Sequence, residues 1–364
     1  MWRSKKMGRV QHNNYVTIVK ALGIILMVIG HSGCPRLMFN VIYLFHMPLF
    51  FFCSGIFYSE MLSKESVGAF LTKRVIKLYF PFVKWALFFL LLHNILMLVG
   101  IYNSSYGFEG GSTFYSVSDI LRRLSMILFT MKGYEELLGG FWFIRSLFVA
   151  CLLIAFVSLI LRFSFKYKHE LICFFFLVMT ILLRRFAPDV EFSRELSMGS
   201  FGAMFYMSGF ILHQYARFWQ NKYGAIVCCT FLLFFLYYFR SGVSMGCGYN
   251  KVIPFSLSAI SGTMLTIYVS KLIEVKPSFI KCFLYYIGNH TLDILALHFL
   301  SFRFVSYFLI LVYRLDVVHV AEHPVINDIC PPHNYWWIIY SMAGVAIPLM
   351  FNRIWQVAID KYNK

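Results

Sequence analysis

The residues with the clearest chemical potential are a lysine and two histidines near the start of the chain. Lys20 and His31 are eleven positions apart, which is about three turns of an α-helix, so their side chains project from the same helix face. A histidine takes up and returns a proton near neutral pH, as acyl transfer to a hydroxyl group requires. Ser32, Gly33 and a second histidine, His46, follow closely. This pattern favours a catalytic role for His31 over the alternative, a structural histidine.

The elements that position these residues must be membrane helices. The chain has 364 residues, of which 60% are hydrophobic and only 13% are charged, whereas soluble domains carry about 25% charged residues. Apolar runs long enough to cross a hydrocarbon core of about 30 Å recur along the whole sequence. We therefore predict an all-α, polytopic integral membrane protein with about ten transmembrane helices. The expected spans are residues 15–33, 38–58, 79–101, 141–161, 171–186, 200–216, 224–240, 252–270, 283–313 and 335–352.

The positive charges indicate the orientation of these helices. Loops on the side where the chain starts hold nineteen lysines and arginines, and loops on the opposite side hold ten. The positive-inside rule then places the N- and C-termini in the cytoplasm, and we expect residues 1–364 to form one multi-pass domain in the cell inner (plasma) membrane. Topology thus explains much of the net charge of +17 without a nucleic-acid partner. The basic cytoplasmic loops would also attract anionic lipid headgroups of the bilayer or an anionic cytosolic ligand.

Three local patterns predict irregularities in the helices. Pro48 lacks a backbone donor and favours a broken or kinked helix in the second span. The span over 283–313 is too long for one perpendicular helix, which favours a tilt, a kink near Gly288 or a short amphipathic piece at one end. Residues 116–129 carry an apolar stripe and an acidic first turn, with Ser118 as the candidate cap, and predict a helix lying in the membrane interface.

Several further polar side chains lie within or at the ends of the expected spans, where each is costly unless it is paired or faces water. Asp293 and His298 are five residues apart and therefore face different sides of their helix, so a dyad between them is not expected. Trp142 has two readings: stacking on the face of a sugar ring, or anchoring at the membrane interface. The others are Lys84, His93, Arg145 and Arg303.

Five segments resemble a known family. Residues 15–32 read YVTIVKALGIILMVIGHS and residues 45–59 read FHMPLFFFCSGIFYS; together they resemble the opening of the membrane acyltransferase-3 family, particularly its fucose O-acetylase-like sugar acetyltransferases. Residues 73–82, 139–150 and 287–300 resemble later motifs of this family in the expected order. The resemblance implies an O-acyltransferase that moves an acetyl or other short acyl group from coenzyme A to a hydroxyl of a cell-surface or lipid-linked sugar.

The resemblance also implies roles for particular residues. His31 matches the family's key histidine, which we assign as the general base. Lys20, the second catalytic candidate, matches a basic position that is arginine in many members, and either stabilises the tetrahedral oxyanion or binds the phosphates of the donor. The implied donor is acetyl-CoA, a cytosolic acyl-CoA, with Lys73, Arg74 and Lys77 as its candidate contacts; ordinary positive-inside residues are the alternative for these three. The candidates for binding the sugar or glycan acceptor are His46, Trp142, Arg145 and His298.

The sequence departs from the family pattern at two informative positions. Many relatives have an aspartate where this chain has Thr17, which leaves the partner of Lys20 open. Arg145 follows the Trp-Phe-Ile motif in place of an apolar or small residue, and either binds substrate or replaces a missing charge partner. We expect no metal, because the histidines are scattered and no His-Glu-x-x-His pattern occurs. A disulfide among Cys34, Cys247 and Cys330 stays open.

Two other functional classes are compatible with a polytopic membrane protein. A glycan-precursor transporter or flippase would also carry charges within its spans, but the internal repeat that transporters often show is not apparent. A non-catalytic partner in a polysaccharide export complex would tolerate substitution of His31. Neither alternative explains the ordered motifs, so we favour the acyltransferase.

Overall fold

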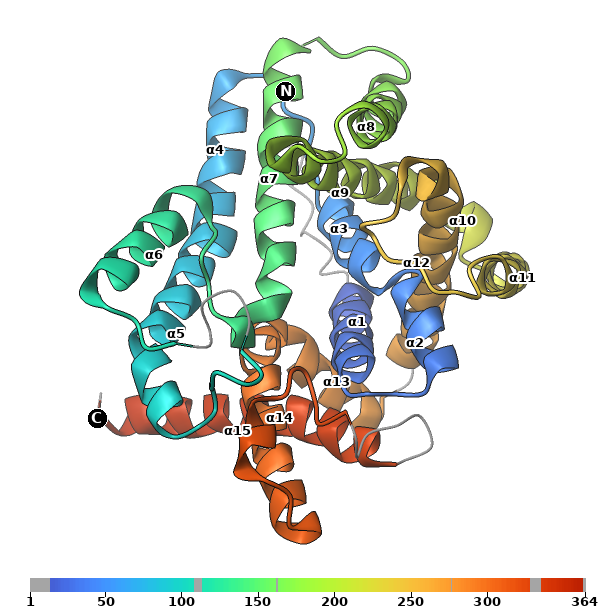
Figure 1. Cartoon of the computed structure of the whole chain (residues 1–364). Helices are drawn as coiled ribbons and strands as arrows, with labels where there is room; N and C mark the ends of the chain where they lie inside the picture. The colour runs from blue at the N-terminus through green and yellow to red at the C-terminus, as the bar shows by residue number, and fades with distance from the viewer. Residues whose placement is uncertain (1–13, 108–112, 162, 276, 328–334, 363–364) are drawn as a thin grey trace.

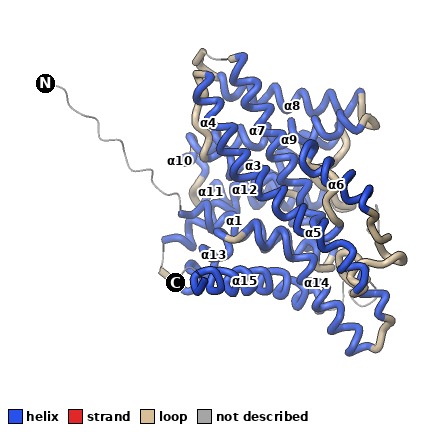
Figure 2. Tube along the Cα trace, turned by 90° about the vertical axis from the view of Figure 1, so that its left-hand side faces the viewer, coloured by secondary structure: helices blue, strands red, loops and turns tan. Residues whose placement is uncertain are grey.

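A computed structural model describes residues 14–107, 113–161, 163–275, 277–327 and 335–362 of the chain. All regular elements in these ranges are helices (Figures 1 and 2). The N-terminal half contains α1 (Asn14–His31), α2 (Arg36–Tyr43), α3 (His46–Ile56), α4 (Lys64–Arg74), the π-helix η1 (Val75–Tyr79), α5 (Phe80–Leu98), α6 (Val117–Thr130), the 3₁₀-helix η2 (Glu136–Phe141), α7 (Trp142–Ile160) and α8 (Lys168–Phe186). The C-terminal half contains α9 (Glu191–Gln214), α10 (Ala216–Trp219), α11 (Lys222–Tyr238), η3 (Tyr249–Lys251), α12 (Val252–Val275), α13 (Phe279–Asn289), α14 (Thr291–Tyr313), η4 (Val317–Ala321) and α15 (Trp336–Tyr362).

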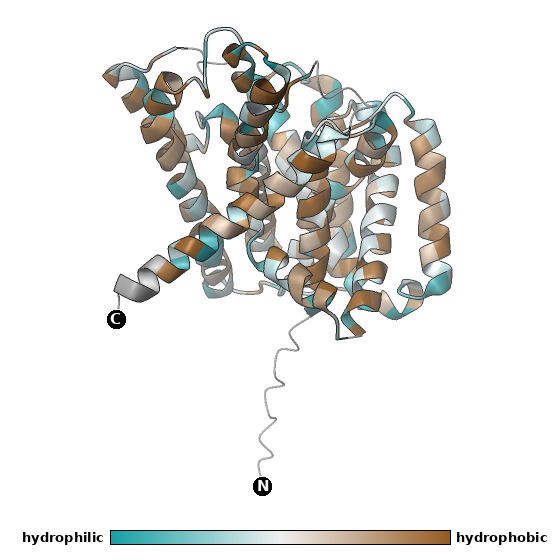
Figure 3. Cartoon of the chain, turned by 90° about the horizontal axis from the view of Figure 1, so that it is seen from below, coloured by the Kyte–Doolittle hydropathy of each residue, from teal (hydrophilic) through white to brown (hydrophobic). Residues whose placement is uncertain are grey.

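Much of the outward-facing helical surface is apolar (Figure 3). Leu98 and Leu311, for example, are 75% and 77% exposed, as is normal only where lipid replaces water. Seven segments of the described chain are long and apolar enough to cross a membrane, so the all-helical membrane fold is confirmed. They are Asn14–His31, Arg36–Ile56, Lys64–Leu98, Glu136–Ile160, Tyr249–Val275, Thr291–Tyr313 and Trp336–Val357.

Three of the ten expected spans are not among these seven segments. The stretches 171–186, 200–216 and 224–240 coincide with α8, α9 and α11, all of which are helical. Charged residues at both ends of α8 and at the start of α9 lower their apolar content, and α11 has only 17 residues. The count of about ten crossings therefore stays a prediction.

Two prolines break or distort helices where their missing N–H requires it. Pro48 cannot donate to the carbonyl of Leu44, and the second span accordingly splits into α2 and α3 just before it, as predicted. Pro81 cannot donate to the carbonyl of Lys77, and the continuous helix from α4 to α5 adopts a π-helical turn there.

The predicted ninth span also consists of two helices. The break falls at His290, whose Nδ1 lies 2.7 Å from the carbonyl oxygen of Tyr286. Gly288, the expected kink, instead permits close packing of α13 on α1: a Cβ at this position would lie 2.1 Å from the carbonyl oxygen of Thr17. The last helix, α15, crosses the lower part of Figure 1 at a steep angle to α7 and packs on α14 and α1.

Residues 116–129 form the expected helix, α6, but Ser118 is not its cap. The cap is Ser116, whose hydroxyl accepts the N–H of Asp119, while the Asp119 carboxylate accepts the N–H of Ser116. These hydrogen bonds from Ser116 hold the pKa of Asp119 below its usual range. The choice of Ser118 was wrong because a capping box needs the acidic residue three positions after the cap.

The cysteines expected on the outer side form no disulfide in the described part of the chain. Cys34 and Cys247 are free thiols, and Cys330 lies outside the described residues. Arg184 binds Cys247 instead, with its Nη1 2.6 Å from the carbonyl oxygen. This contact ties the segment between α11 and η3 to α8.

The crossing of α3 and α9 is built on glycines. A Cβ at Gly55 would lie 1.7 Å from the carbonyl oxygen of Tyr206, and one at Gly209 would lie 2.1 Å from that of Phe52. Backbone atoms in a helix cannot move aside as a flexible side chain can. The two helices are therefore packed backbone to backbone, as small residues allow in membranes.

We expect Gly55→Ala to destabilise the protein, because the added methyl group forces α3 away from α9. Overpacking of this kind costs about 1–3 kcal/mol. The measurement is the midpoint of thermal unfolding in detergent. The matched control is Gly68→Ala in α4, where a Cβ would meet nothing within 4 Å and helix propensity favours alanine. Equal midpoints for the two variants would contradict the close crossing.

Candidate functional site

His31, the last residue of α1, lines a cavity of about 310 Å³. Its other walls come from the α2–α3 hairpin, the start of α7, α9, α14 and the segment before η3. The lining residues are Met27, His31, Tyr43, His46, Met47, Pro48, Gly140, Trp142, Met198, Ser244, Met245, Gly246 and Leu295. Tyr43, the last residue of α2, and His46, the first residue of α3, line this space on either side of the break before Pro48.

Three histidines meet at this cavity, hereafter the His31 cavity. The rings of His31 and His298 are 5.7 Å apart between centroids, and Phe299 packs 5.1 Å from His31. His46 Nδ1 lies 2.9 Å from the carbonyl oxygen of Ile42, so this nitrogen carries a proton and Nε2 is left as an acceptor. His298 Nδ1 donates to a backbone carbonyl of its own helix in the same way, and its buried Nε2 has no hydrogen-bond partner among the described residues.

A second and much more polar cavity has a volume of about 620 Å³ and is lined on one side by α6. It contains three linked ion pairs: Lys132 contacts Glu191 at 2.5 Å and also Glu195, and Arg145 contacts Glu195 at 2.5 Å. Burial raises the pKa of the Glu195 carboxyl, but hydrogen bonds from Arg145 and Lys132 outweigh this effect and hold it below the usual range. The lining also includes Tyr115, Arg122, Arg123, Met126, Gly133, Tyr134, Glu135, Glu136 and Gly139.

Two adjacent residues of η2 form part of the partition between the two cavities. Gly139 lines the polar cavity and Gly140 lines the His31 cavity. A Cβ at Gly139 would lie 3.2 Å from Phe299, and one at Gly140 would lie 2.7 Å from Leu295. Side chains at either position would thicken this partition, so the glycine pair keeps the polar cavity next to the histidines.

A buried charge network holds η2, which forms part of the partition between the two cavities, against α14. Arg303 of α14 is 1% exposed, and its guanidinium contacts Glu136 at 3.3 Å and the carbonyl of Glu322. His323 Nδ1 lies 3.2 Å from the same Glu136 oxygen. Burial, together with the charge of Arg303, lowers the pKa of His323 to about 3, so this histidine is neutral at physiological pH. The network joins η2 to α14 across 167 residues of sequence.

A second buried pair anchors the chain that enters η2. His93 of α5 lies 2.9 Å from Glu135 through Nδ1 and 2.9 Å from the carbonyl oxygen of Thr113 through Nε2. Both partners offer acceptor oxygens, a carboxylate and a backbone carbonyl, so the ring links α5 to two points of the segment that leads into η2. The ring also stacks on Tyr115 at 3.4 Å. The pair fixes the floor of the polar cavity.

Comparison with known proteins identifies the chemistry of this fold. The model of the acyltransferase-3 family, described as an acyltransferase domain, matches residues 13–353. The chain belongs to the acyltransferase-3 family. It is therefore a membrane acyltransferase. No curated protein matches the chain, and no solved structure does.

Within this acyltransferase, the residues singled out from the sequence occupy three places. His31, His46 and Trp142 line one cavity, and His298 lies against His31. Arg145 lies outside that cavity, in the polar one, where its partner is Glu195. The third group is Lys20, Lys73, Arg74 and Lys77, which does not line either cavity.

The four cations of this third group lie toward the other end of α1. Lys20 is close enough to Lys77 for their charges to interact, and neither contacts a carboxylate in the described part of the chain. Arg74 donates to the hydroxyl of Tyr206 at 2.8 Å, and Lys73 is exposed. Thr17, which stands where many relatives have an aspartate, packs through its carbonyl on Gly288. The group thus keeps its positive charge available for an anion.

Apart from Arg145, sequence reasoning did not assign the charged residues that line the polar cavity or pair beside it. Arg303 and His93 were singled out as costly polar residues, but their partners Glu136 and Glu135 were not. Each partner comes from a distant segment, so no spacing rule connects them. The one signal available in the sequence was the energetic cost of burying these side chains, because a buried arginine in a membrane requires a carboxylate or carbonyl partner.

Proposed function

We propose that this membrane acyltransferase transfers an acetyl or other short acyl group from coenzyme A to a hydroxyl of a cell-surface or lipid-linked sugar, with His31 as the general base. The observation that carries the proposal is the His31 cavity, in which one histidine of the family motif meets two others and a tryptophan within a space of about 310 Å³. The positive-inside bias supports cytoplasmic termini and an inner-membrane location.

The cation group supports binding of coenzyme A at the cytoplasmic end of α1. Lys20 and His31 are separated by about 16 Å along the helix axis. Coenzyme A carries phosphates at one end and its thioester at the end of a long flexible arm. Its phosphates would bind near Lys20 and Lys77, and its arm would place the thioester at His31. The lysine ammonium acts as a point charge, so it can bind a phosphate without the fixed planar geometry that an arginine guanidinium imposes.

The reaction then needs one proton transfer at His31. The sugar oxygen attacks the thioester carbonyl while a ring nitrogen of His31 takes the hydroxyl proton. The tetrahedral intermediate collapses with cleavage of the C–S bond, and the proton passes from His31 to the departing thiolate. The ring of His298 lies 5.7 Å from that of His31, and its buried Nε2 has no hydrogen-bond partner among the described residues. In the proposed reaction this nitrogen would accept the second ring proton of His31 and so orient the base.

The polar cavity supports a polyhydroxylated acceptor. Its volume of about 620 Å³ lies in the range of small-ligand sites, and its charged lining offers both donors and acceptors. The adjacent residues Gly139 and Gly140, one lining each cavity, support an acceptor that binds in the polar cavity close to the His31 cavity. Trp142 supplies an aromatic face inside that cavity, on which a sugar ring would stack.

The direct test is acyl transfer in membranes that contain the wild-type chain. Radiolabelled acetyl-CoA is added to the cytoplasmic face of inverted vesicles, with extracted cell-surface glycan sealed inside. We expect label in the glycan. Well-folded protein that labels no glycan, with acetyl-CoA supplied at either face, would contradict the proposal.

We expect Lys20→Gln to raise the KM for acetyl-CoA about tenfold with a small change in kcat, because one charge-assisted contact to a phosphate is worth about 1.5 kcal/mol. The measurement is initial transfer rate against acetyl-CoA concentration. Lys222→Gln is the matched control, since Lys222 begins α11, away from α1, and should leave KM unchanged. A normal KM for Lys20→Gln would remove Lys20 from the donor site.

A further inference from the structure

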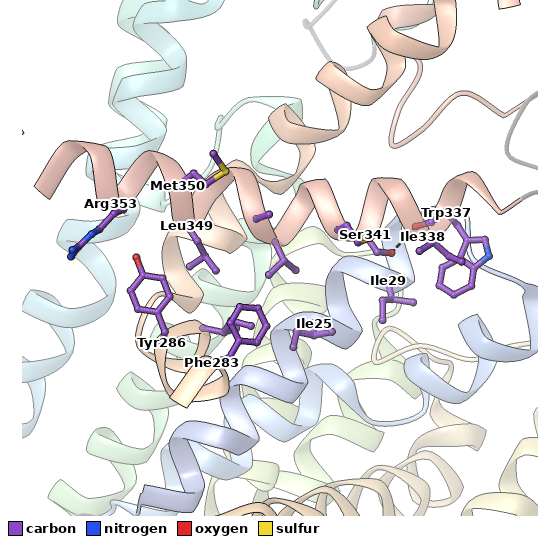
Figure 4. A pocket seen from close by; sticks show the side chains of 14 residues that line it. Ile25, Ile29, Phe283, Tyr286, Trp337, Ile338, Ser341, Leu349, Met350 and Arg353 are labelled. Atoms are coloured by element: carbon purple, nitrogen blue, oxygen red, sulfur yellow. Dashed lines mark hydrogen bonds between the residues drawn. The ribbon is translucent and has the colours of Figure 1, made fainter. Parts of the chain in front are cut away.

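A long groove lies between α15 and the pair α1 and α13 (Figure 4). Its volume is about 820 Å³. On α1 it is lined by Ile25 and Ile29, whereas the His31 cavity is lined by Met27 and His31. Residues two positions apart point to nearly opposite sides of a helix. The groove therefore runs along the face of α1 that looks away from the candidate active site.

The groove is apolar along its length and cationic at one end. Figure 4 shows Trp337 and Arg353 at opposite ends, with Ile25, Ile29 and Leu349 between them. Sixteen residues of α15 separate the two ends, which corresponds to about 24 Å of helix. Arg353 makes no ion pair within the described residues. A slot of this shape matches an extended hydrocarbon chain that ends in an anion.

One wall of the groove is closed and the other is open. Ile287 is fully buried and Leu349 is 6% exposed, whereas Met342 and Met350 are 67% and 62% exposed. In a membrane the open side faces lipid, so a chain enters sideways from the bilayer. Methionine side chains are flexible and adapt to irregular apolar partners, which suits the entrance to such a slot.

We propose that this groove binds one acyl chain of an anionic phospholipid whose phosphate pairs with Arg353. A guanidinium forms two parallel hydrogen bonds with phosphate oxygens, and the cytoplasmic leaflet is rich in anionic lipids. A zwitterionic lipid offers the same chain and phosphate, but its own cation competes with Arg353. The site therefore selects by headgroup charge as well as by chain. This inference does not depend on the proposed acyl-transfer function.

The headgroup is tested by lipid titration of the full-length protein in detergent, read by native mass spectrometry. The probes are phosphatidylglycerol and phosphatidylcholine with identical acyl chains. We expect wild type to prefer phosphatidylglycerol, and Arg353→Gln to bind it about tenfold more weakly, close to phosphatidylcholine. Arg353→Lys should keep part of the preference. Arg217→Gln, an exposed cation on α10, should bind both lipids as wild type does.

The chain site is tested by filling the groove. Ala346 lines it from α15, and Ala346→Trp should remove binding of both lipids while the thermal midpoint without added lipid stays near that of wild type. Ile29→Trp fills the groove from the opposite wall and should also remove binding of both lipids. Ile354→Trp, at an exposed position outside the groove, is the control. If Arg353→Gln keeps the wild-type lipid preference, or if folded Ala346→Trp keeps its bound lipid, the proposal is wrong.

Discussion

His31→Ala is expected to lower acyl transfer by two to four orders of magnitude, the usual contribution of a general base. The substitution removes the only side chain to which the proposed mechanism assigns proton transfer. It leaves the cavity walls in place, because Tyr43, His298 and Phe299 are held by their own helices. The measurement is the initial rate of label transfer from acetyl-CoA to glycan at saturating donor.

The control for this variant is His290→Ala, which removes an imidazole from the junction between α13 and α14 but not from the His31 cavity. It should transfer at close to the wild-type rate. Added imidazole should restore part of the activity of His31→Ala, since the cavity has room for a free base, and should not affect His290→Ala. Equal transfer by His31→Ala and wild type would refute the mechanism.

The largest effect on stability is expected from Arg303→Met. It leaves Glu136 buried without its guanidinium partner, and breaking a buried pair in this way costs about 3–5 kcal/mol. The yield of monodisperse protein and its thermal midpoint in detergent should both fall. Removing both charges, in Arg303→Met with Glu136→Leu, should recover most of the loss because no unpaired charge remains.

Arg122→Met is the matched control for the buried arginine. Arg122 also pairs with a carboxylate, that of Asp119 at 3.8 Å, but its side chain is 67% exposed. Exposed pairs contribute about 0–1 kcal/mol, so its midpoint should hardly move. If Arg122→Met and Arg303→Met unfold at the same temperature, the Glu136–Arg303 pair does not hold η2 to α14.

The helices were largely predictable because a membrane leaves few alternatives for an apolar chain. Pro48 marked the α2–α3 break, since a proline removes one particular backbone hydrogen bond. The break at His290 lies two residues after Gly288, near which a kink was one of the predicted alternatives. The sequence could not place it more closely, because a glycine that permits close packing and one that permits bending look the same in sequence. The number of membrane crossings could not be predicted in the same way. The helices α8 and α9 combine apolar stretches with charged ends, and α11 is short.

The candidate site was predictable in part, because some of its residues lie on one helix or in one hairpin. The spacing of Lys20 and His31 is a property of one helix, and the meeting of His31 with His46 follows from one hairpin. The polar cavity depends on α9 meeting α6, η2 and the start of α7, from which α9 is distant in sequence. Arg145 illustrates the limit: its chemistry marked it as functional, but only the packing shows that it faces Glu195 and not His31.

The separation of the cation group from the polar cavity has a consequence for enzyme kinetics under the proposed function. His31 lies between them, so donor and acceptor would approach it from two different directions. Both substrates could therefore be bound at the same time. Such a site operates through a ternary complex, and double-reciprocal plots of rate against one substrate at several concentrations of the other would intersect instead of running parallel.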